Sequence, residues 1–308
     1  TSVPPRSAAV AQMELTLRIR SRRHQLGQSI RDVSSQLQFS SNYFSAVENG
    51  RALLATDKLT KLCQVLELDA RETDELLALR EIAREPRWTS EYSQLLTNDE
   101  LALYIGLEYG ATKINTFEGL IAPGLLQCDN YAVTLFRDDP ATPGIRQQKR
   151  MELRRRRQQR LVADDDPLIL HVLLGETVLM QQIGGPAVLR EQIVHMLDLI
   201  ERLSATLTVR IIPFTASPRG MVNSTTLHLL EFDSPHLPML AWREGITPIG
   251  ISDDPDLIDI LLTNYDRGTA SALSADESVA TSAGRLDRAS RPSSIAPSGS
   301  TRPTSSNR

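Results

Sequence analysis

The sequence predicts a two-part protein: an all-α domain at residues 12–84 (the head), followed by an α/β or α+β domain at residues 88–285 (the body). Three observations support this prediction. Apolar residues recur at three- and four-residue spacing through the head, as they do on short helices that share a core. In the body, short apolar runs alternate with longer helical patterns. The 308 residues also exceed the usual length of one domain, about 100–150 residues.

Both ends of the chain offer little that a folded segment could bury. Residues 1–11 contain Pro, Ser and Ala, and residues 286–308 are dominated by Ser, Arg, Pro and Thr. We therefore expect both segments to be disordered.

The net charge of −4 is unevenly distributed. Residues 1–61 carry nine basic and four acidic residues, a net charge of +5, and residues 285–308 carry +4, so the segment between them carries −13. A basic head on an acidic body indicates that only the head contacts a polyanion.

The composition also argues against several classes of protein. No apolar run approaches the ~20 residues that span a bilayer, and the first residues lack the apolar segment of a signal peptide, so we expect a cytoplasmic protein without membrane contact. Cys63 and Cys128 form no C-x-x-C pair, which argues against a zinc site or a disulfide scaffold. Common catalytic motifs such as G-x-S-x-G and H-E-x-x-H are absent, so we expect no enzyme, no cofactor and no metal.

The five histidines are scattered along the chain. His171 and His228 lie within apolar strand candidates, where packing is a more ordinary role than catalysis. The carboxylate run Asp164–Asp166 precedes Pro167 and indicates a loop, not a metal site.

Residues 23–50 contain the signals of two short helices joined by a tight turn. Ser29 is suited to cap the first helix, and an aspartate follows in its first turn. Ser40 is suited to cap the second helix, and apolar residues four and seven positions later give that helix a buried face. Asn49–Gly50 ends it, because glycine readily adopts the left-handed conformation. This arrangement predicts a helix-turn-helix.

The segment resembles the DNA-binding domain of the Xre/Cro family, which includes phage repressors. The resemblance rests on Arg23-x-Gln25-Leu26-Gly27, on Val47-Glu48-Asn49-Gly50, and on a leucine-rich fourth helix with Leu59, Leu62, Leu66 and Leu68. It implies a phage-repressor-like head that binds double-stranded DNA, with the helix after Ser40 in the major groove.

The resemblance also assigns residues to roles in DNA binding. Asn42 is the best base reader, because an amide can pair bidentately with adenine. The full set of expected base contacts is Ser41, Asn42, Ser45 and Ala46. The expected phosphate contacts are Ser29, Asn49, Arg51 and Lys58.

Four residues of the head bear on its stability more than on recognition. In the family, an Arg and a Glu at the positions of Arg23 and Glu48 tie the first helix to the recognition helix, so we interpret them as a structural ion pair. Gln38 stands at a turn position where the family often has Gly, and Gln28 stands where an apolar residue is usual. A left-handed conformation at Gln38 would cost about 1 kcal/mol or more.

The body contains candidates for both strands and helices. The helical pattern at residues 186–203 places six apolar residues on one face, and residues 254–266 form a second helix. The order of the sheet does not follow from these patterns. The expected strands are residues 168–174, 206–212, 225–232 and 238–243.

The body is similar to the C-terminal domain of a large actinobacterial group of Xre regulators described as antitoxin-like. The most specific match is Pro123-Gly124-Leu125-Leu126-Gln127 with Tyr131. The resemblance implies a regulatory role, with a small protein encoded nearby as a possible partner. A ligand sensor whose body binds a small molecule remains the alternative.

Two segments of the body have open roles. Pro123–Gln127 is either a partner or ligand loop or a structural turn that docks a helix. Lys149–Arg160 holds seven basic residues and one acid. It is either a second DNA contact, a docking site for an acidic partner, or the solvated face of a helix that pairs with the acidic body, which is the commonest role of such runs.

We expect a homodimer. One recognition helix covers only a few base pairs, too few to select an operator from ~10⁶ or more competing sites. Two heads on half-sites ~34 Å apart would multiply the discrimination. The apolar positions of the head are mostly used inside it, so we expect the dimer surface in the body, at residues 186–203 and around Pro123–Tyr131.

Overall fold

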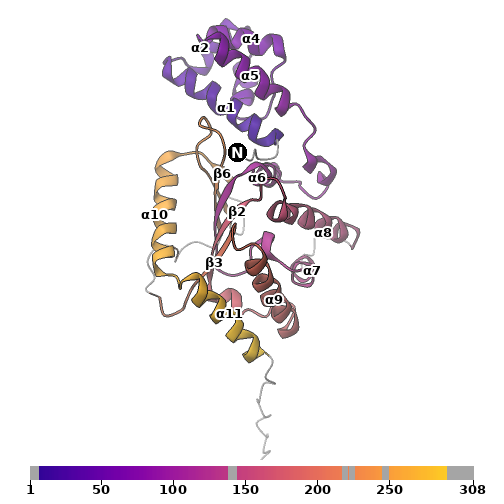
Figure 1. Cartoon of the computed structure of the whole chain (residues 1–308). Helices are drawn as coiled ribbons and strands as arrows, with labels where there is room; N and C mark the ends of the chain where they lie inside the picture. Colours follow the sequence, from indigo (N-terminus) through magenta and orange to yellow (C-terminus); the bar gives the residue numbers. More distant parts are fainter. Residues whose placement is uncertain (1–6, 138–143, 217–220, 222–225, 245–249, 290–308) are drawn as a thin grey trace, which may run out of the picture.

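The computed structural model describes residues 7–137, 144–216, 221, 226–244 and 250–289. A helical head lies at one end of the molecule, and a larger body built on one sheet lies below it in Figure 1. No helix of these residues is both long and apolar enough to cross a bilayer.

The head is all-α, as predicted, and buries its own apolar core. Ser29 and Ser40 cap α2 and α3 as expected, and Gly50 adopts the left-handed conformation, with φ of 67°, after α3 ends. Phe44 and Val47 of α3 are buried in the core. The five helices are α1 (Ala8–Gln25), α2 (Ile30–Gln36), α3 (Ser41–Glu48), α4 (Thr56–Val65) and α5 (Ala70–Ala83).

Helix α1 begins before the expected boundary, so the expectation of disorder is wrong for residues 7–11. Ser7 caps the helix and also donates a 2.7 Å hydrogen bond to the carbonyl of Gly106. Ala9 and Ala11 are buried. Ala9 of α1 packs closely against Gly106 of the body. This close packing orders residues 7–11, which have little apolar surface of their own. Residues 1–6 lie outside the described residues.

The predicted start of C-terminal disorder, at residue 286, also lies too early in the sequence. Helix α11 (Ala275–Ala289) extends past residue 285, and Leu286 packs against the core of the body. Residues 290–308 lie outside the described residues.

The body is an α+β fold with a mixed six-stranded sheet. The strand order is β3-β2-β1-β4-β5-β6, in which β1, β2 and β3 run parallel and β4, β5 and β6 add antiparallel strands. All four expected strands are present. The strands are β1 (Lys113–Glu118), β2 (Ile169–Gly175), β3 (Leu207–Ile212), β4 (Thr226–Glu231), β5 (Leu240–Glu244) and β6 (Gly250–Ser252).

The sequence analysis missed β1, which is the central strand. Its side chains from Ile114 to Glu118 are buried, yet Asn115, Thr116 and Glu118 are polar. The sequence of this strand does not form an apolar run, and its three polar side chains are buried because each has a hydrogen-bond partner on β4.

Helices cover both faces of the sheet. Helix α10 lies on one face, and α7, α8 and α9 lie on the other (Figure 1). The helices expected near residues 186–203 and 254–266 are confirmed as α9 and α10. The α-helices of the body are α6 (Asp99–Gly110), α7 (Asp129–Arg137), α8 (Gly144–Gln158), α9 (Pro186–Arg202), α10 (Pro255–Ser271) and α11. Four 3-10 segments are η1 (Trp88–Tyr92), η2 (Gly124–Leu126), η3 (Gln159–Val162) and η4 (Glu176–Leu179).

Helix α6 lies between the head and the sheet. Its Gly106 and Gly110 face α1, where an added Cβ would come within 2.6 Å of the Cβ of Ala9 and 2.7 Å of Val10. Its Tyr104 and Glu108 are buried on the side of the sheet. A single helix therefore contacts both the first helix of the head and the interior of the body.

Candidate functional site

Helix α3 presents a polar face to solvent. Ser41 and Asn42 are exposed, Ser45 and Ala46 are half-buried, and the opposite face enters the core. The side chain of Asn42 makes no hydrogen bond with any other residue that the structure describes. Asn42 is therefore available to meet a base edge, and the geometry is compatible with the expected role.

The Arg23 and Glu48 side chains form the predicted pair between α1 and α3. Arg23 Nε lies 2.7 Å from Glu48 Oε1, and Nη2 lies 2.9 Å from Oε2, so the contact is bidentate. Both side chains are at least nine-tenths buried. Arg23 also donates a 2.7 Å hydrogen bond to the carbonyl of Gln28. Arg23 therefore ties α1 both to the residue before the cap of α2 and to the end of α3.

The residues expected to contact phosphate are all exposed, and three of them also have roles within the head, since Ser29 caps α2. Asn49 donates a 2.7 Å hydrogen bond to the carbonyl of Ser45 and so completes the end of α3. The Lys58 ammonium lies 5.4 Å from the ring centroids of both Phe39 and Tyr43. These contacts hold the two polar groups beside the exposed face of α3. Ser29, Arg51 and Lys58 are exposed with Asn49.

The two departures from the family pattern have separate structural outcomes. Gln38 adopts the left-handed conformation, with φ of 56°, as the turn position requires. The Oε1 atom of Gln28 is buried without a hydrogen-bond partner among the described residues. An unpaired buried acceptor destabilises the fold, because it has lost its hydration without gaining a partner.

Arg31 is a candidate contact that the sequence analysis missed. It lies on α2, next to the residues that cap this helix, and is exposed. In the docking geometry of a helix-turn-helix, the first helix of the motif crosses the phosphate backbone. The positive charge of Arg31 on that helix is the signal that could have identified it.

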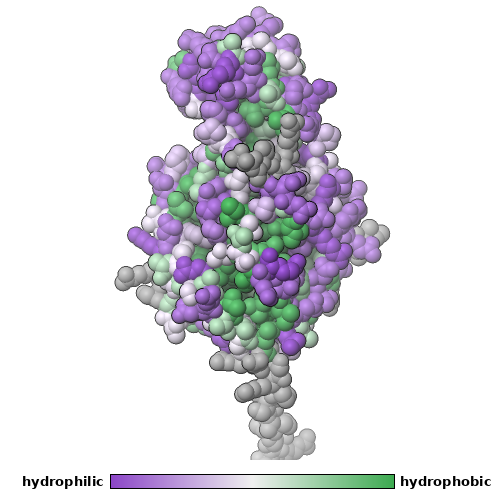
Figure 2. Space-filling view, in the orientation of Figure 1, coloured by the Kyte–Doolittle hydropathy of each residue, from purple (hydrophilic) through white to green (hydrophobic). Residues whose placement is uncertain are grey.

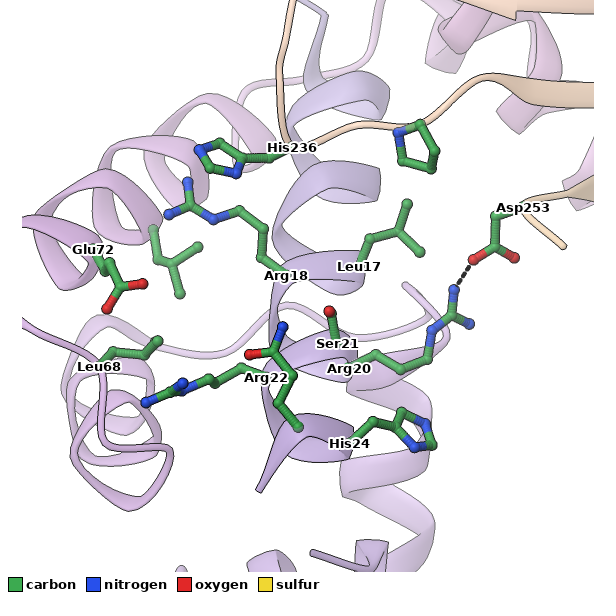
Figure 3. Close-up of a pocket in the computed structure, with 13 residues that line it drawn as sticks. Leu17, Arg18, Arg20, Ser21, Arg22, His24, Leu68, Glu72, His236 and Asp253 are labelled. Atoms are coloured by element: carbon green, nitrogen blue, oxygen red, sulfur yellow. Dashed lines mark hydrogen bonds and ion pairs between the residues drawn. The ribbon is translucent and has the colours of Figure 1, made fainter. Parts of the chain in front are cut away.

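The junction between head and body contains a pocket of about 370 Å³ beside α1 (Figure 3). Arg20 of α1 forms an ion pair with Asp253, which follows β6. Two other arginines of the pocket are also engaged, since Arg18 pairs with Glu75 and Arg22 donates to the carbonyl of Leu66. The three arginines that line this pocket therefore already have partners.

The body contains a larger cleft of about 670 Å³, between the sheet and helices α6, α7 and α8. Its polar floor comes from alternate positions of paired strands, where Thr116 lies opposite His228 and Glu118 lies opposite Thr226. In Figure 2 the head is mostly hydrophilic, whereas apolar surface gathers on the body. The apolar lining residues include Leu95, Leu96, Leu101, Ile105, Ile114, Leu120, Ile121, Leu125, Leu135, Phe136, Leu153 and Leu170.

One buried ion pair stands at the wall of this cleft. Arg157 Nε and Nη2 each lie 2.7 Å from an oxygen of Glu108, and the hydroxyl of Tyr104 donates a 2.9 Å hydrogen bond to the same carboxylate. Burial raises the pKa of Glu108, but the charge and hydrogen bonds of Arg157 outweigh this effect and hold that pKa below its ordinary value. The pair is therefore ionised and internally neutral.

The second carboxyl group of the cleft behaves differently. Burial raises the pKa of Glu118 to about 8, although Thr226 donates a 2.8 Å hydrogen bond to it. Burial lowers the pKa of the neighbouring His228 to about 4. Near pH 7 both groups are mostly neutral, so the 3.9 Å contact between His228 Nε2 and Glu118 Oε1 is not an ion pair.

Replacement of Glu118 by Gln should remove a pH dependence of stability. The folded pKa of about 8 exceeds the ordinary value of 4.5, so the folded state holds a proton that the unfolded state has lost. The contribution of Glu118 to the free energy of unfolding of the body should therefore fall as pH rises from about 4.5 to about 8, and Glu118→Gln should abolish this fall. Chemical unfolding at pH 5 and pH 8, followed by tryptophan fluorescence, measures the difference. The exposed Glu201→Gln is the control, and an unchanged pH dependence in Glu118→Gln would contradict the assignment.

The segment Pro123–Tyr131 is a structural turn that also forms part of the cleft wall. Leu125, Leu126 and Tyr131 are buried in the core. Gln127 donates a 2.6 Å hydrogen bond to the carbonyl of Ala122 and accepts one of 2.5 Å from Arg154. The six candidate residues are thus brought together, but most of their surface is inside the body. The segment is therefore unsuited to be the dimer surface that we expected.

The interpretation of Lys149–Arg160 as a solvated helix face is wrong for part of the run. Arg157 and Arg160 are turned inward, and Arg160 pairs with Asp166 at 3.0 Å. The expected pairing with acidic residues of the body is confirmed on the outer face, where Arg155 pairs with Asp129 and Arg156 with Glu91. A search for apolar residues at helical spacing misses the inward face of this segment, because the buried groups on that face are guanidinium ions.

Comparison with known families agrees with this division of the chain. A family model described as a helix-turn-helix domain matches residues 14–76, which include α2 and α3. A second model, described as a domain of unknown function (DUF5753), matches residues 101–281, from α6 into α11. No significant match was found among curated proteins or among solved structures. Since the second match covers more than half of the chain, the protein belongs to the family of this domain of unknown function (DUF5753), with a helix-turn-helix domain ahead of it.

Proposed function

We propose that this protein is a sequence-specific transcriptional regulator of the Xre type, which reads DNA with α3. The observation that supports the proposal most is that α3 is held in the core by one face and exposes the other face to solvent. The buried Phe44, Val47 and Glu48 fix one face of α3, and the exposed Asn42 lies on the other. Residues 1–61, which include α2 and α3 and carry a net charge of +5, supply the charge that attracts the DNA backbone. The protein acts in the cytoplasm, where the nucleoid is accessible.

DNA binding should depend on both salt and sequence. With a handful of phosphate contacts, the log of the association constant should fall against the log of salt concentration with a slope of several units. Gel shifts of the full chain on fragments upstream of its own gene, between low and physiological salt, measure the slope. Asn42→Ala should lower discrimination at one base pair by about 1–3 kcal/mol, whereas Arg51→Ala should weaken binding to all sequences about equally.

The two variants serve as controls for each other. If Asn42→Ala lowered the affinity for operator and random DNA by the same factor, Asn42 would not be a base reader. Binding that did not depend on salt concentration, or no binding to any fragment, would overturn the proposed function itself.

We further propose that the protein binds DNA as a homodimer. The support is the small footprint of one recognition helix, which cannot select an operator alone. Helix α9 is a poorer candidate for the interface than its sequence suggested, since its apolar residues Leu189, Ile193 and Met196 are buried within the body. Its outer face is mostly charged and includes Arg190, Glu191, Asp198 and Glu201.

Light scattering of the full chain, alone and with an operator fragment, measures the assembly. A mass of twice 34.2 kDa without DNA is the expected result. One protomer on the operator at saturation would contradict the dimer.

The body is proposed to control the head. A small protein encoded nearby, as in antitoxin-like systems, remains a hypothesis that follows from the sequence resemblance alone. A small-molecule ligand is favoured by one specific observation, the cleft beside α6, because the same helix packs against α1 of the head.

A further inference from the structure

The cleft of the body has the size and lining of a small-molecule site. Its volume of about 670 Å³ falls within the range of ligand pockets, about 300–1,000 Å³. Leucine and isoleucine side chains from α6, from β1 and β2, and from the segment after β1 form most of its wall. Such a wall favours an apolar ligand body, whose burial removes hydrocarbon surface from water.

The charged groups of the cleft do not balance one another. Glu108 and Arg157 form a bidentate pair with two contacts of 2.7 Å and cancel. Glu118 and His228 are both mostly neutral near pH 7. Arg150 and Glu244 also line the cleft, and each has interactions of its own.

Arg154 is a cation of this cleft without a carboxylate partner in the described part of the chain. Its Nη1 atom donates a 2.5 Å hydrogen bond to the neutral Oε1 of Gln127, and its guanidinium lies 5.1 Å from the ring centroid of Phe136. Burial and, to a lesser extent, the nearby Arg157 lower the pKa of Arg154 to about 9, against the smaller opposing effect of Glu108 and Glu244, so the group is still charged at pH 7. Burial of a charge without an opposite charge is costly, and an anionic ligand would remove this cost.

The guanidinium of Arg154 is also positioned to bind. The side chain is half-buried, and none of its nitrogens is both sealed from solvent and without a partner. A Cβ on Gly124 would lie only 2.7 Å from Nη1, so the glycine leaves room for the guanidinium over the turn. Its remaining N–H groups can donate two parallel hydrogen bonds to a planar carboxylate.

We propose that the cleft binds a small monocarboxylic acid with an apolar body, whose carboxylate pairs with Arg154 and whose body packs against the wall from α6 and β1. A single guanidinium without a carboxylate at ion-pair distance matches one negative charge. A phosphate dianion would leave an excess charge in a largely apolar space. This proposal names a ligand class for the proposed control of the head by a small molecule.

Calorimetric titration of the full chain with two matched pairs of probes tests the proposal. The pairs are decanoate with decan-1-ol, and 1-naphthylacetate with 2-(1-naphthyl)ethanol. At least one acid should bind about tenfold or more tighter than its alcohol, since a charge-assisted pair is stronger than a neutral hydrogen bond. Because no DNA is present, this result is independent of the proposed function in DNA binding.

Three variants locate the site. Arg154→Gln should reduce the affinity of the acid to that of the alcohol and leave alcohol binding unchanged. Arg155→Gln, on the adjacent exposed residue of α8, should keep the full preference. Leu135→Trp fills space at the apolar wall and should weaken the binding of acid and alcohol alike. This variant tests the site even if an Arg154 variant fails to fold.

Several results would overturn the proposal. These are no binding of any of the four probes, equal affinity for acid and alcohol, an acid preference that survives Arg154→Gln, and tight binding that survives Leu135→Trp. Unfolding followed by circular dichroism checks that each variant retains its fold, because Leu135→Trp adds a third tryptophan to Trp88 and Trp242.

Discussion

Replacement of Arg23 by Ala is expected to lower the free energy of unfolding of the head by about 3–5 kcal/mol. The change leaves the Glu48 carboxylate buried without its bidentate partner, and it also removes the hydrogen bond from Arg23 to the carbonyl of Gln28. DNA binding should weaken as a consequence, because α3 loses the contact that fixes its last turn to α1.

The two parts of the protein can be followed separately. Both tryptophans, Trp88 and Trp242, pack in the core of the body, and residues 8–83 contain none. Arg23→Ala should therefore shift only the part of the helical circular-dichroism transition that comes from α1–α5, since α6–α11 of the body contribute the rest, while the fluorescence transition stays in place. The second change Glu48→Gln should restore part of the loss, and the exposed Arg71→Ala should cost at most about 1 kcal/mol. Loss of DNA binding with an unchanged unfolding curve would instead make Arg23 a direct DNA contact.

Replacement of Arg157 by Met should have an effect of similar size on the body, about 3–5 kcal/mol. Glu108 is buried and would keep only its hydrogen bond from Tyr104. Tyr104 stacks on Trp242 with ring centroids 4.8 Å apart, so tryptophan fluorescence reports the change directly. The surface pair of Arg155 with Asp129 provides the control, since Arg155→Met should cost at most about 1 kcal/mol.

The pH dependence of the Arg157→Met variant gives a second measurement. Without Arg157, burial should raise the pKa of Glu108 above its unfolded value, so the folded state would bind a proton more tightly. Stability of the variant should therefore recover as pH falls through the raised pKa, and this recovery should exceed the gain that Glu118 gives the wild type over the same pH range. A variant that gained no more stability than the wild type between pH 8 and pH 5 would show that Glu108 is not the group left unpaired.

The head could be predicted from sequence because its determinants are local. Ser29, Ser40 and Gly50 cap or end helices through contacts within a few residues. The resemblance to the Xre/Cro family then supplied the pairing of Arg23 with Glu48, which the structure confirms. The start of α1 was missed, because Ala8–Ala11 is ordered by a glycine-bearing helix about a hundred positions further along the chain.

The body shows which features only the tertiary structure decides. Its apolar strands and the helix α9 follow from periodicity, since burial of one face imposes a repeat on the sequence. The central strand β1 and the inward face of Lys149–Arg160 do not, because both bury polar groups whose partners lie far away in the chain. Buried charged residues leave no apolar periodicity in the sequence. A charged side chain is tolerated in the interior only where the fold brings an opposite charge next to it, as it brings Glu108 next to Arg157. The sequence thus determined a helix-turn-helix head and four strands of the sheet, whereas the cleft and the position of Arg154 in it arise only when distant segments of the body meet.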